Sequence, residues 1–249
     1  GNPRFKLIDL DITDQHNVNR VIAEEKPDYF INFAANSFVG TSWKMPVNHM
    51  ETNCMAVLYQ LCAIKEHAPN CRYYNAGSSE EFGDVVTAPQ DETHPLRPRS
   101  PYGASKASAR HLVKVWRESY GLYAVQGWLF NHEGVRRGEE FLTRKVTKGV
   151  ADIFWKDSIG DEFKPLQLGN LEAKRDWSDA EDFVDGIWKM LNQKEPKEYV
   201  LASGETHTIR EFVETAFAYA GYGAEECHWK GKSVYEEYLH GDKVLVQVN

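Results

Sequence analysis

Tyr102 and Lys106 are the pair of residues whose types and spacing best suit chemistry. They stand four positions apart in a stretch, 102–120, whose pattern predicts a helix, so their side chains share one helical face. A phenol with a pKa of about 10 is a poor base at neutral pH, but a nearby ammonium favours the phenolate. The pair can therefore take a proton from a substrate hydroxyl. The same spacing is common in exposed helix pairs, so the motif alone is weak.

A second group with chemical potential is the run Ser78-Ser79-Glu80-Glu81, which directly follows a predicted strand at 72–76. A carboxylate at that place could act as a general base or acid if burial raised its pKa. Alternatively, Ser78 caps a helix whose first turn carries acidic residues. Taken alone, the run favours the cap. Beside Tyr102 and Lys106, it favours catalysis by a hydroxyl and a carboxylate of this run.

Basic residues gather further along this acidic chain. Arginines and lysines occupy 136–137 and 144–145, and Arg175 follows in the sequence Arg-Asp-Trp. Guanidinium groups suit recognition of a diphosphate, although solvated surface charge is the alternative. His132 is by default a structural histidine. Cys227 and His228 have no partners at ligand spacing, so no metal site is predicted.

The elements that would position these residues alternate between short β-rich runs and longer helical ones. Strands are predicted at 5–10, 28–33, 72–76, 124–129, 166–168 and 199–202. Helices are predicted at 14–25, 50–67, 102–120, 139–154, 179–192 and 209–220. This alternation predicts an α/β fold with a doubly wound parallel sheet. Ligands bind outside the carboxyl ends of such strands, and the small or polar segments there suit a nucleotide crevice. Ordinary polar turns after each strand are the equally weighted alternative.

Composition and length narrow the class of protein. The 249 residues are 42% apolar and carry a net charge of −8, which argues against a global nucleic-acid footprint. No apolar run of about 18 residues exists to span a membrane, and no secretory leader is recognisable. Four cysteines without a CxxC pair suit a reducing, cytoplasmic setting. Strand-like runs at both ends predict a chain cut at each end.

Several motifs together resemble the extended short-chain dehydrogenase/reductase family. The strand–Ser78–x–Glu80 segment, Tyr102-xxx-Lys106 and Arg175-Asp176-Trp177 carry the broad resemblance. Within that family, the chain resembles the GDP-mannose 4,6-dehydratases. The narrower resemblance rests on the segments 99–102, 130–133, 136–138, 143–145 and 168–177. It runs from Phe5 to about Tyr222. The resemblance implies a Rossmann-type sheet, with an incomplete NADP-binding domain over 1–131. It also implies a smaller α/β region over 132–249, mainly substrate-binding and with some elements that return to the Rossmann sheet.

The resemblance also implies a reaction. GDP-mannose would be oxidised at C4, lose water across C5 and C6, and be reduced at C6, giving GDP-4-keto-6-deoxymannose, a step towards GDP-fucose. Tyr102 would take the proton of the C4 hydroxyl, and Lys106 would lower the pKa of Tyr102 and bind the nicotinamide ribose. Glu80 would remove the C5 proton, and Ser78 would hydrogen-bond O4. The cofactor would be NADP, tightly held and regenerated in each cycle.

Binding residues follow from the same resemblance. Implied cofactor contacts are Asp11, Ile12, Phe33, Ala34, Ala35, Ser37, Tyr102, Lys106, His132 and Arg137. Implied contacts with the GDP-sugar are Asn131, Thr143, Lys145 and Arg175. The protein is also expected to be a cytoplasmic homodimer or homotetramer that binds no nucleic acid, membrane or metal.

The chain also departs from the family. It contains no GxxGxxG or GxGxxG, so the first βαβ unit, with its pyrophosphate-binding turn, is expected to be missing, as is the family's C-terminal part. Gly77 and Phe38 stand where the family more often has Ser and His. Two alternatives stay open: another nucleotide-sugar epimerase or dehydratase of the same fold, and a non-catalytic binding module. The 249 residues as written are expected to bind cofactor weakly and to turn over negligibly.

Overall fold

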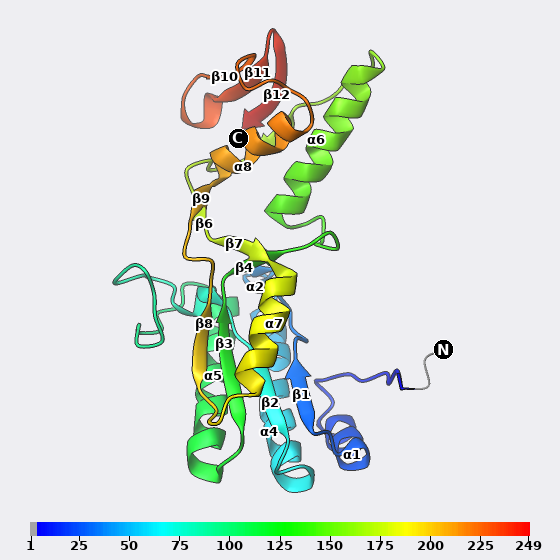
Figure 1. Cartoon of the computed structure of the whole chain (residues 1–249), viewed down its shortest axis with the longest axis vertical. Coiled ribbons are helices and arrows are strands. Elements are labelled where there is room, and N and C mark those ends of the chain that lie inside the picture. Colours follow the sequence, from blue (N-terminus) through cyan, green and yellow to red (C-terminus); the bar gives the residue numbers. More distant parts are fainter. Residues whose placement is uncertain (1–3) are drawn as a thin grey trace. The chain divides into compact units, whose positions relative to one another are not determined.

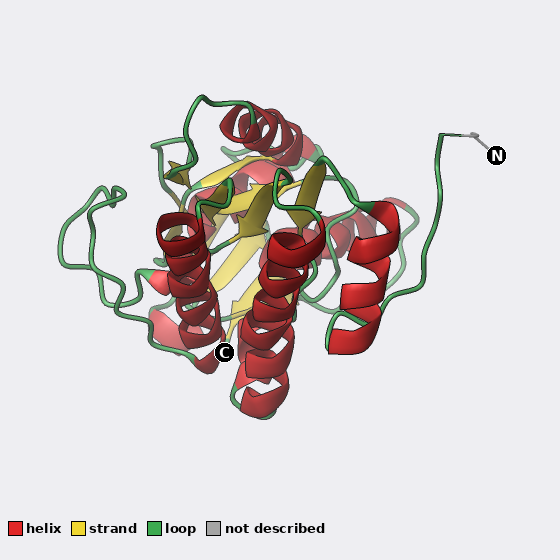
Figure 2. Ribbon diagram, turned by 90° about the horizontal axis from the view of Figure 1, so that it is seen from below, coloured by secondary structure: helices red, strands yellow, loops and turns green. Residues whose placement is uncertain are grey.

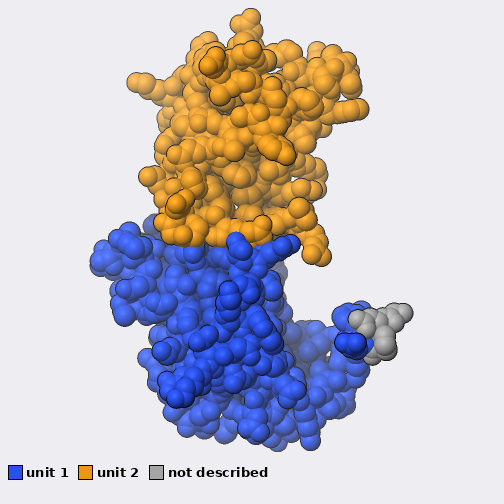
Figure 3. Space-filling view, in the orientation of Figure 1, with its two compact units in different colours: residues 1–130, 181–202 blue, residues 131–180, 203–249 orange. Residues whose placement is uncertain are grey.

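The structure, a computed structural model, describes residues 4–249 and divides the chain into two compact units. Unit 1 contains residues up to 130 together with 181–202, and unit 2 contains 131–180 and 203–249 (Figure 3). The chain therefore leaves unit 1 near the predicted boundary after 131 and returns to it over residues 181–202. The assignment of one region to cofactor and the other to substrate remains a prediction.

Unit 1 is built on a four-stranded parallel sheet in the order β1-β2-β3-β8 (Figure 1). The strands are β1 (Tyr29–Asn32), β2 (Arg72–Ala76), β3 (Ala124–Leu129) and β8 (Glu198–Leu201). Because all four strands run the same way, the residues that follow them lie at one edge of the sheet. The residue after β2 and the residue after β1 are thereby neighbours at that edge.

Helices cover both faces of this sheet (Figure 2). They are α1 (Gln15–Glu25), α4 (Ala56–His67), α5 (Pro101–Tyr120) and α7 (Ala180–Leu191). Successive strand residues point to opposite faces. Tyr73 accordingly packs in the cluster formed with α1, α4 and α5, whereas Tyr74 packs with Phe183 and Ile187 of α7. The unit is therefore a doubly wound α/β sheet, as the sequence predicts.

Short helical turns join these elements. They are α2 (Val39–Ser42), α3 (Pro46–Met50), the π-helix η1 (Glu51–Met55) and the 3-10 helix η2 (Ser79–Glu81). The π-helix leads directly into α4, so the predicted helix 50–67 is wound differently over its first part.

Unit 2 packs two helices, α6 (Leu142–Ser158) and α8 (Ile209–Tyr219), against a mixed sheet in the order β10-β11-β12-β5. The sheet strands are β10 (Cys227–Lys230), β11 (Glu237–His240), β12 (Lys243–Val248) and β5 (Leu166–Leu168), and a 3-10 turn, η3 (Ser233–Tyr235), precedes β11. Two further pairs form: β4 (Asn131–Glu133) with β7 (Trp177–Asp179), and β6 (Lys174–Arg175) with β9 (His207–Thr208).

Two expectations about elements need correction, and some strands were missed. The predicted strand at 5–10 does not form. Within residues 4–249 no strand pairs with that segment, and its Phe5 and Leu7 side chains are 70% and 80% exposed, so a strand there would leave its backbone groups unpaired. The helix predicted at 139–154 begins at Leu142 and runs to Ser158. The antiparallel strands β10 and β11 were not predicted.

None of the helices within residues 4–249 is both long and apolar enough to cross a membrane.

Candidate active site

The turn that follows β2 is fixed by a reciprocal cap. The backbone N–H of Glu80 donates to Ser78 Oγ at 3.2 Å, and the Ser78 N–H donates to Glu81 Oε1 at 2.9 Å. The cap expected as the alternative to catalysis is thus present, and its acidic member is Glu81. Glu80 contributes its backbone N–H to the cap, whereas its carboxylate takes no part in these two bonds and the residue is half-buried. The carboxylate of the cap and the carboxylate of the candidate base thus belong to different residues.

Helix α5 presents Tyr102 and Lys106 on one buried face, as predicted. The Ser100 hydroxyl accepts from the Gly103 N–H at 3.0 Å and starts the helix, with Pro101 in its first turn. Tyr102 is 7% exposed and Lys106 5%. The imidazole of His49 lies edge-on to the Tyr102 ring, with centroids 6.4 Å apart.

Two contacts bring the helix against the turn. A Cβ atom added to Gly103 would lie only 2.6 Å from the carbonyl oxygen of Glu80, so this close approach requires glycine. One helical turn later, Lys106 Nζ donates to the carbonyl oxygen of Ala76 at 2.8 Å. The structure therefore brings the backbone of the Ser78–Glu80 turn beside the helix that carries Tyr102 and Lys106.

Burial makes this region electrostatically unusual. Removal from water lowers the pKa of Lys106 to about 8, against the opposing attraction of Glu81. Burial likewise raises the pKa of Glu81 to about 7, while hydrogen bonds from Ser78 and Trp128 and the charges of Lys106 and Arg110 oppose that rise. Burial thus disfavours the charged forms of both the Glu81 carboxyl and the Lys106 amine, at the end of β2.

Glu81 is a residue that the sequence predictions left without a role. The spacing Ser-x-x-Glu, typical of a capping box, was the signal that could have separated it from Glu80. The Glu81 side chain is fully buried, and its carboxylate also accepts from Trp128 Nε1 at 2.8 Å and from Gln126 Nε2 at 3.3 Å. Gly77 makes room for this arrangement, because a Cβ there would lie 2.1 Å from Gln126 Nε2 and 2.6 Å from Glu81 Oε1.

Asn53 is a second residue that the sequence did not reveal. Its side chain accepts from the Asn36 N–H at 2.8 Å and donates to the Asn36 carbonyl at 3.0 Å. It also donates to Ser105 Oγ at 3.1 Å. Asn53 lies in the π-helix and so ties the loop after β1 to α5. Such a turn leaves no apolar period in the sequence, which is why the residue was missed.

The predicted cofactor residues of unit 1 other than Tyr102 and Lys106 lie in the loops before α1 and after β1. The Asp11 carboxylate accepts from the Thr13 N–H at 2.9 Å and from the Thr13 hydroxyl at 2.7 Å, and these bonds lower its pKa. The Phe33 side chain is 54% exposed, with its ring 6.0 Å from that of Tyr74. The remaining positions are exposed or half-buried: Ile12, Ala34, Ala35 and Ser37. Their contacts with a cofactor remain predictions.

In unit 2, some of the predicted binding residues share a cavity of about 510 Å³. Arg137 and Thr143 line it, and both are bound to Glu133, Arg137 by an ion pair of 3.2 Å and Thr143 by a hydrogen bond of 2.6 Å. Asn131 and His132 belong to β4, which pairs with β7 at the cavity wall.

Two other predicted binding residues of unit 2 are not among the residues that line this cavity. The Lys145 amine instead donates to the Gln167 carbonyl at 2.7 Å, and Arg175 donates to the neighbouring Lys174 carbonyl at 2.8 Å.

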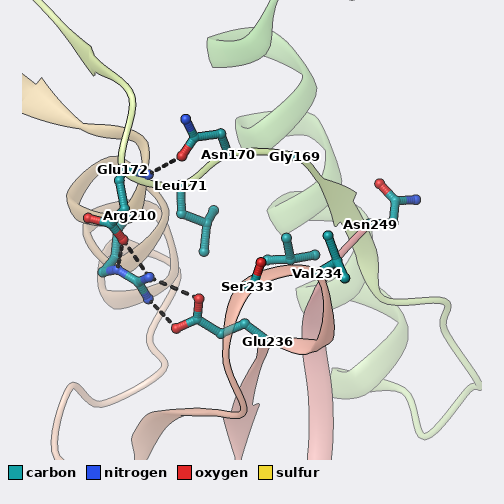
Figure 4. Close-up of a pocket in the computed structure, with 10 residues that line it drawn as sticks. Gly169, Asn170, Leu171, Glu172, Arg210, Ser233, Val234, Glu236 and Asn249 are labelled. Atoms are coloured by element: carbon teal, nitrogen blue, oxygen red, sulfur yellow. Dashed lines mark hydrogen bonds and ion pairs between the residues drawn. The ribbon is translucent and has the colours of Figure 1, made fainter.

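A separate cavity of unit 2, about 360 Å³ in volume, contains none of the predicted residues (Figure 4). Its cation, Arg210, is bound by two carboxylates, with Glu172 Oε1 at 2.6 Å and Glu236 Oε1 at 2.9 Å. The guanidinium also lies over the Trp229 ring, 4.5 Å from its centroid. Because both carboxylates already neutralise Arg210, we assign this cavity no anion.

Comparison with known proteins gives a consistent match. All 249 residues match the family model described as GDP-mannose 4,6 dehydratase. The chain is 41% identical to the GDP-mannose 4,6 dehydratase of Drosophila melanogaster over 98% of its own length, and 44% identical to GDP-mannose 4,6 dehydratase 2 of Arabidopsis thaliana over 87%. It spans 60% and 58% of those two relatives, respectively.

Solved structures share the fold. A dTDP-glucose 4,6-dehydratase from Streptomyces venezuelae, with NAD and TYD bound, superposes with a TM-score of 0.78 at 25% identity, covering 88% of this chain and 65% of that one. The structure of RMD from Pseudomonas aeruginosa complexed with NADPH gives 0.77 at 24% identity, covering 86% and 71%. The predicted Rossmann-type α/β class is thereby confirmed. With a family match over its whole length, the chain belongs to the GDP-mannose 4,6-dehydratase family.

Proposed function

We propose that the protein containing this chain converts GDP-mannose to GDP-4-keto-6-deoxymannose. The observation that carries the proposal is the close approach of α5, with Tyr102 and Lys106, to the turn that bears Ser78 and Glu80. A glycine at 103 allows that approach, with its Cβ position 2.6 Å from the Glu80 carbonyl oxygen. A proton acceptor for an alcohol and a carboxylate for a second deprotonation thus lie on adjoining segments, as a dehydratase requires.

Tyr102 and Lys106 serve the first proton transfer. Both side chains are almost fully buried. The family resemblance gives Lys106 the role of favouring the Tyr102 phenolate, because a nearby ammonium stabilises an ionised phenol. Tyr102 Oη takes the proton of the sugar C4 hydroxyl, and Ser78 Oγ supports O4 by a hydrogen bond. A bound nicotinamide would accept the hydride from C4 and later return it to C6.

Glu80 serves the elimination. Once C4 is a ketone, the proton at C5 becomes acidic and the Glu80 carboxylate removes it. The C5=C6 double bond forms as the C6–O bond breaks, and the proton held by Glu80 leaves with the hydroxyl as water. Glu81 is excluded from this role because its carboxylate is fully buried and bound by Ser78, Gln126 and Trp128. Glu80 is half-buried and therefore accessible to a ligand.

The residues present fit the nicotinamide end of a cofactor better than its phosphates. Lys106 and Tyr102 offer an ammonium and a hydroxyl for the nicotinamide ribose, while the sequence contains no glycine-rich phosphate turn. We propose NADP, on the family resemblance. Solved neighbours were obtained with NADPH in one case and NAD in another, so titration with both cofactors is required.

Further parts of the proposal rest on the resemblance. The GDP moiety would be held by Asn131, Thr143, Lys145 and Arg175, and the cofactor by His132, Arg137 and the loops at 11–12 and 33–37. A cytoplasmic homodimer or homotetramer that supplies GDP-fucose synthesis is part of the same proposal. Light scattering of the full-length gene product tests the assembly.

Product analysis tests the function. The full-length gene product is incubated with GDP-mannose, UDP-glucose and dTDP-glucose in separate reactions, and the products are identified by mass spectrometry and NMR. Loss of water from GDP-mannose alone supports the proposal. Dehydration or epimerisation of another sugar nucleotide supports a different enzyme of the same fold. Tight cofactor binding without turnover of any of the three contradicts the proposal as well.

A further inference from the structure

Glu81 lies in a pocket built for a carboxylate. Its side chain is fully buried, and three donors reach it: the Ser78 N–H at 2.9 Å, Trp128 Nε1 at 2.8 Å and Gln126 Nε2 at 3.3 Å. A buried carboxylate is costly unless it is hydrogen-bonded and paired with a charge. The three donors meet the first need, and a cation must meet the second.

A row of amides across the sheet points towards the same carboxylate. Gln60 donates to Asn32 at 3.4 Å, Asn32 to Asn75 at 3.0 Å, and Asn75 to Gln126 at 2.8 Å, before Gln126 donates to Glu81. The Tyr73 hydroxyl begins the row by donating to Gln60 at 2.8 Å. Every bond runs in one direction, so the row ends on a group that must accept. That order favours an ionised Glu81.

Lys106 is the cation that matches this site. It is 5% exposed, and its Nζ donates to the Ala76 carbonyl, one residue before the glycine that makes room for Glu81. We propose that Glu81 is a positioning residue for the catalytic pair, the buried counter-charge that keeps Lys106 protonated and anchored at the end of β2. The consequence for turnover rests on the proposed function, but the coupling of the two charges does not.

Other charged and titratable groups face this pair. Arg110, one helical turn beyond Lys106, adds positive charge near Glu81 but is itself bound to Glu198 at 2.7 Å. Tyr74 of β2 is fully buried, and burial raises the pKa of its phenol, so it stays neutral. Tyr102 lies on the same helix as Lys106. Glu81 is thus the carboxylate that favours the protonated Lys106.

Titration of Lys106 tests the proposal directly. The full-length gene product is labelled with 13C at lysine Cε, and the Lys106 signal is assigned from its loss in Lys106→Met. In Glu81→Gln the midpoint of the Lys106 titration is expected to fall by about one to three pH units, because the opposing negative charge is gone. Glu118→Gln, which removes a charge from the exposed side of α5, is the matched control and should leave the midpoint unchanged.

Titration of Glu81 in Lys106→Met is a second test, which does not depend on the folding of Glu81→Gln. With the Glu side-chain carboxyl labelled, Lys106→Met should raise the pH at which Glu81 titrates, since the ammonium that favours its ionised form is lost. If Glu81→Gln does not fold, this second titration decides alone. An unchanged Lys106 midpoint in folded Glu81→Gln, or an unchanged Glu81 midpoint in Lys106→Met, overturns the proposal.

Activity provides a separate readout. Under the proposed function, Glu81→Gln lowers kcat more than KM and moves the alkaline limb of the pH profile to lower pH, and Glu81→Asp, which keeps the charge, restores part of both. Coupled titrations in a protein without dehydratase activity would refute the proposed function alone. Dehydratase activity with uncoupled titrations would refute this inference alone.

Discussion

Lys106 Nζ and the carbonyl oxygen of Ala76 lie 2.8 Å apart, and this hydrogen bond joins helix α5 to the last residue of strand β2. The next residues along the chain form the turn with Ser78 and Glu80. The same bond therefore connects the helix that carries Tyr102, the candidate base for the C4 hydroxyl, to the turn that carries Glu80, the candidate base for C5. The distance between the two chemical groups is therefore set by a strand end and a helix, both rigid elements.

Replacing the phenol tests the first proton transfer. Tyr102→Phe in the full-length gene product should lower kcat roughly 100- to 10,000-fold, the usual contribution of a general base, while cofactor affinity changes little. Steady-state kinetics and cofactor titration check this. Tyr120→Phe, an exposed tyrosine of the same helix, is the control. A Tyr102→Phe enzyme with near-normal kcat would remove Tyr102 from the reaction.

Replacing Glu80 should allow the C4 oxidation and block the elimination that follows it. Glu80→Gln keeps the C4 oxidation, which needs Tyr102, but loses the base for C5. Reduced nicotinamide is then expected to accumulate on the enzyme after GDP-mannose is added, with no 4-keto-6-deoxy product. Stopped-flow absorbance measures the reduced nicotinamide, and product analysis measures the 4-keto-6-deoxy sugar. If Glu80→Gln forms product at the normal rate, the elimination uses another base.

Gly103 should be required for full activity because it lets helix α5 lie close to the turn that carries Ser78 and Glu80. Alanine normally favours a helix over glycine by about 1 kcal/mol. In Gly103→Ala, however, the new methyl would lie 2.6 Å from the Glu80 carbonyl oxygen and force helix and turn apart. We expect a net loss of about 1–3 kcal/mol in unfolding free energy and a lower kcat.

Gly223→Ala is the matched control for this variant. Its nearest contact would be Glu226 at 3.6 Å, so it should be close to neutral. Urea denaturation and kinetics compare the two variants. Equal effects in both would mean that the approach at Gly103 is not tight.

The buried pair should give stability an unusual pH dependence. The pKa of Glu81 rises from 4.5 to about 7, so between these values the folded state holds more protons than the unfolded state, and stability falls as pH rises. The pKa of Lys106 falls from 10.5 to about 8, so between about 8 and 10.5 the unfolded state holds more protons, and stability rises with pH. Each slope is on the order of 1 kcal/mol per pH unit.

Urea denaturation across pH 4.5–10.5 measures this effect, with the double variant Glu81→Gln/Lys106→Met as the comparison. The wild-type protein should lose stability relative to the double variant towards a minimum between about 7 and 8. Parallel curves for the two proteins would show that the pair keeps ordinary pKa values.

Much of the fold followed from local patterns in the sequence. The helix that carries Tyr102 and Lys106 was predicted to within one residue of its start. The structure shows why its ends are sharp: Ser100 and Pro101 begin it and Gly121 ends it. Strands β2 and β3 have the bounds predicted from their sequence, since both are short runs set between turn residues. The parallel direction of the strands in this sheet was predicted from the alternation of strands and helices.

The candidate site was predicted less completely, for physical reasons. Whether Glu80 or Glu81 is buried depends on which of the two reaches Trp128 and Gln126, residues more than forty positions away. Gly77, noted as a departure from the family, acquires its reason only when Gln126 and Glu81 pack over it. Asn53 depends on a π-helical turn, and the run 5–10 lacks a partner strand among the described residues. Each depends on tertiary contacts that a local pattern does not contain.

The most direct test of the central claim is the structure of the product that the full-length gene product forms from GDP-mannose. We expect NMR of the nucleotide sugar to show a keto group at C4 and a methyl group at C6, with the amount of cofactor unchanged at the end. Conversion of GDP-mannose to any product that keeps its C6 hydroxyl, or no conversion with cofactor bound, would contradict the claim.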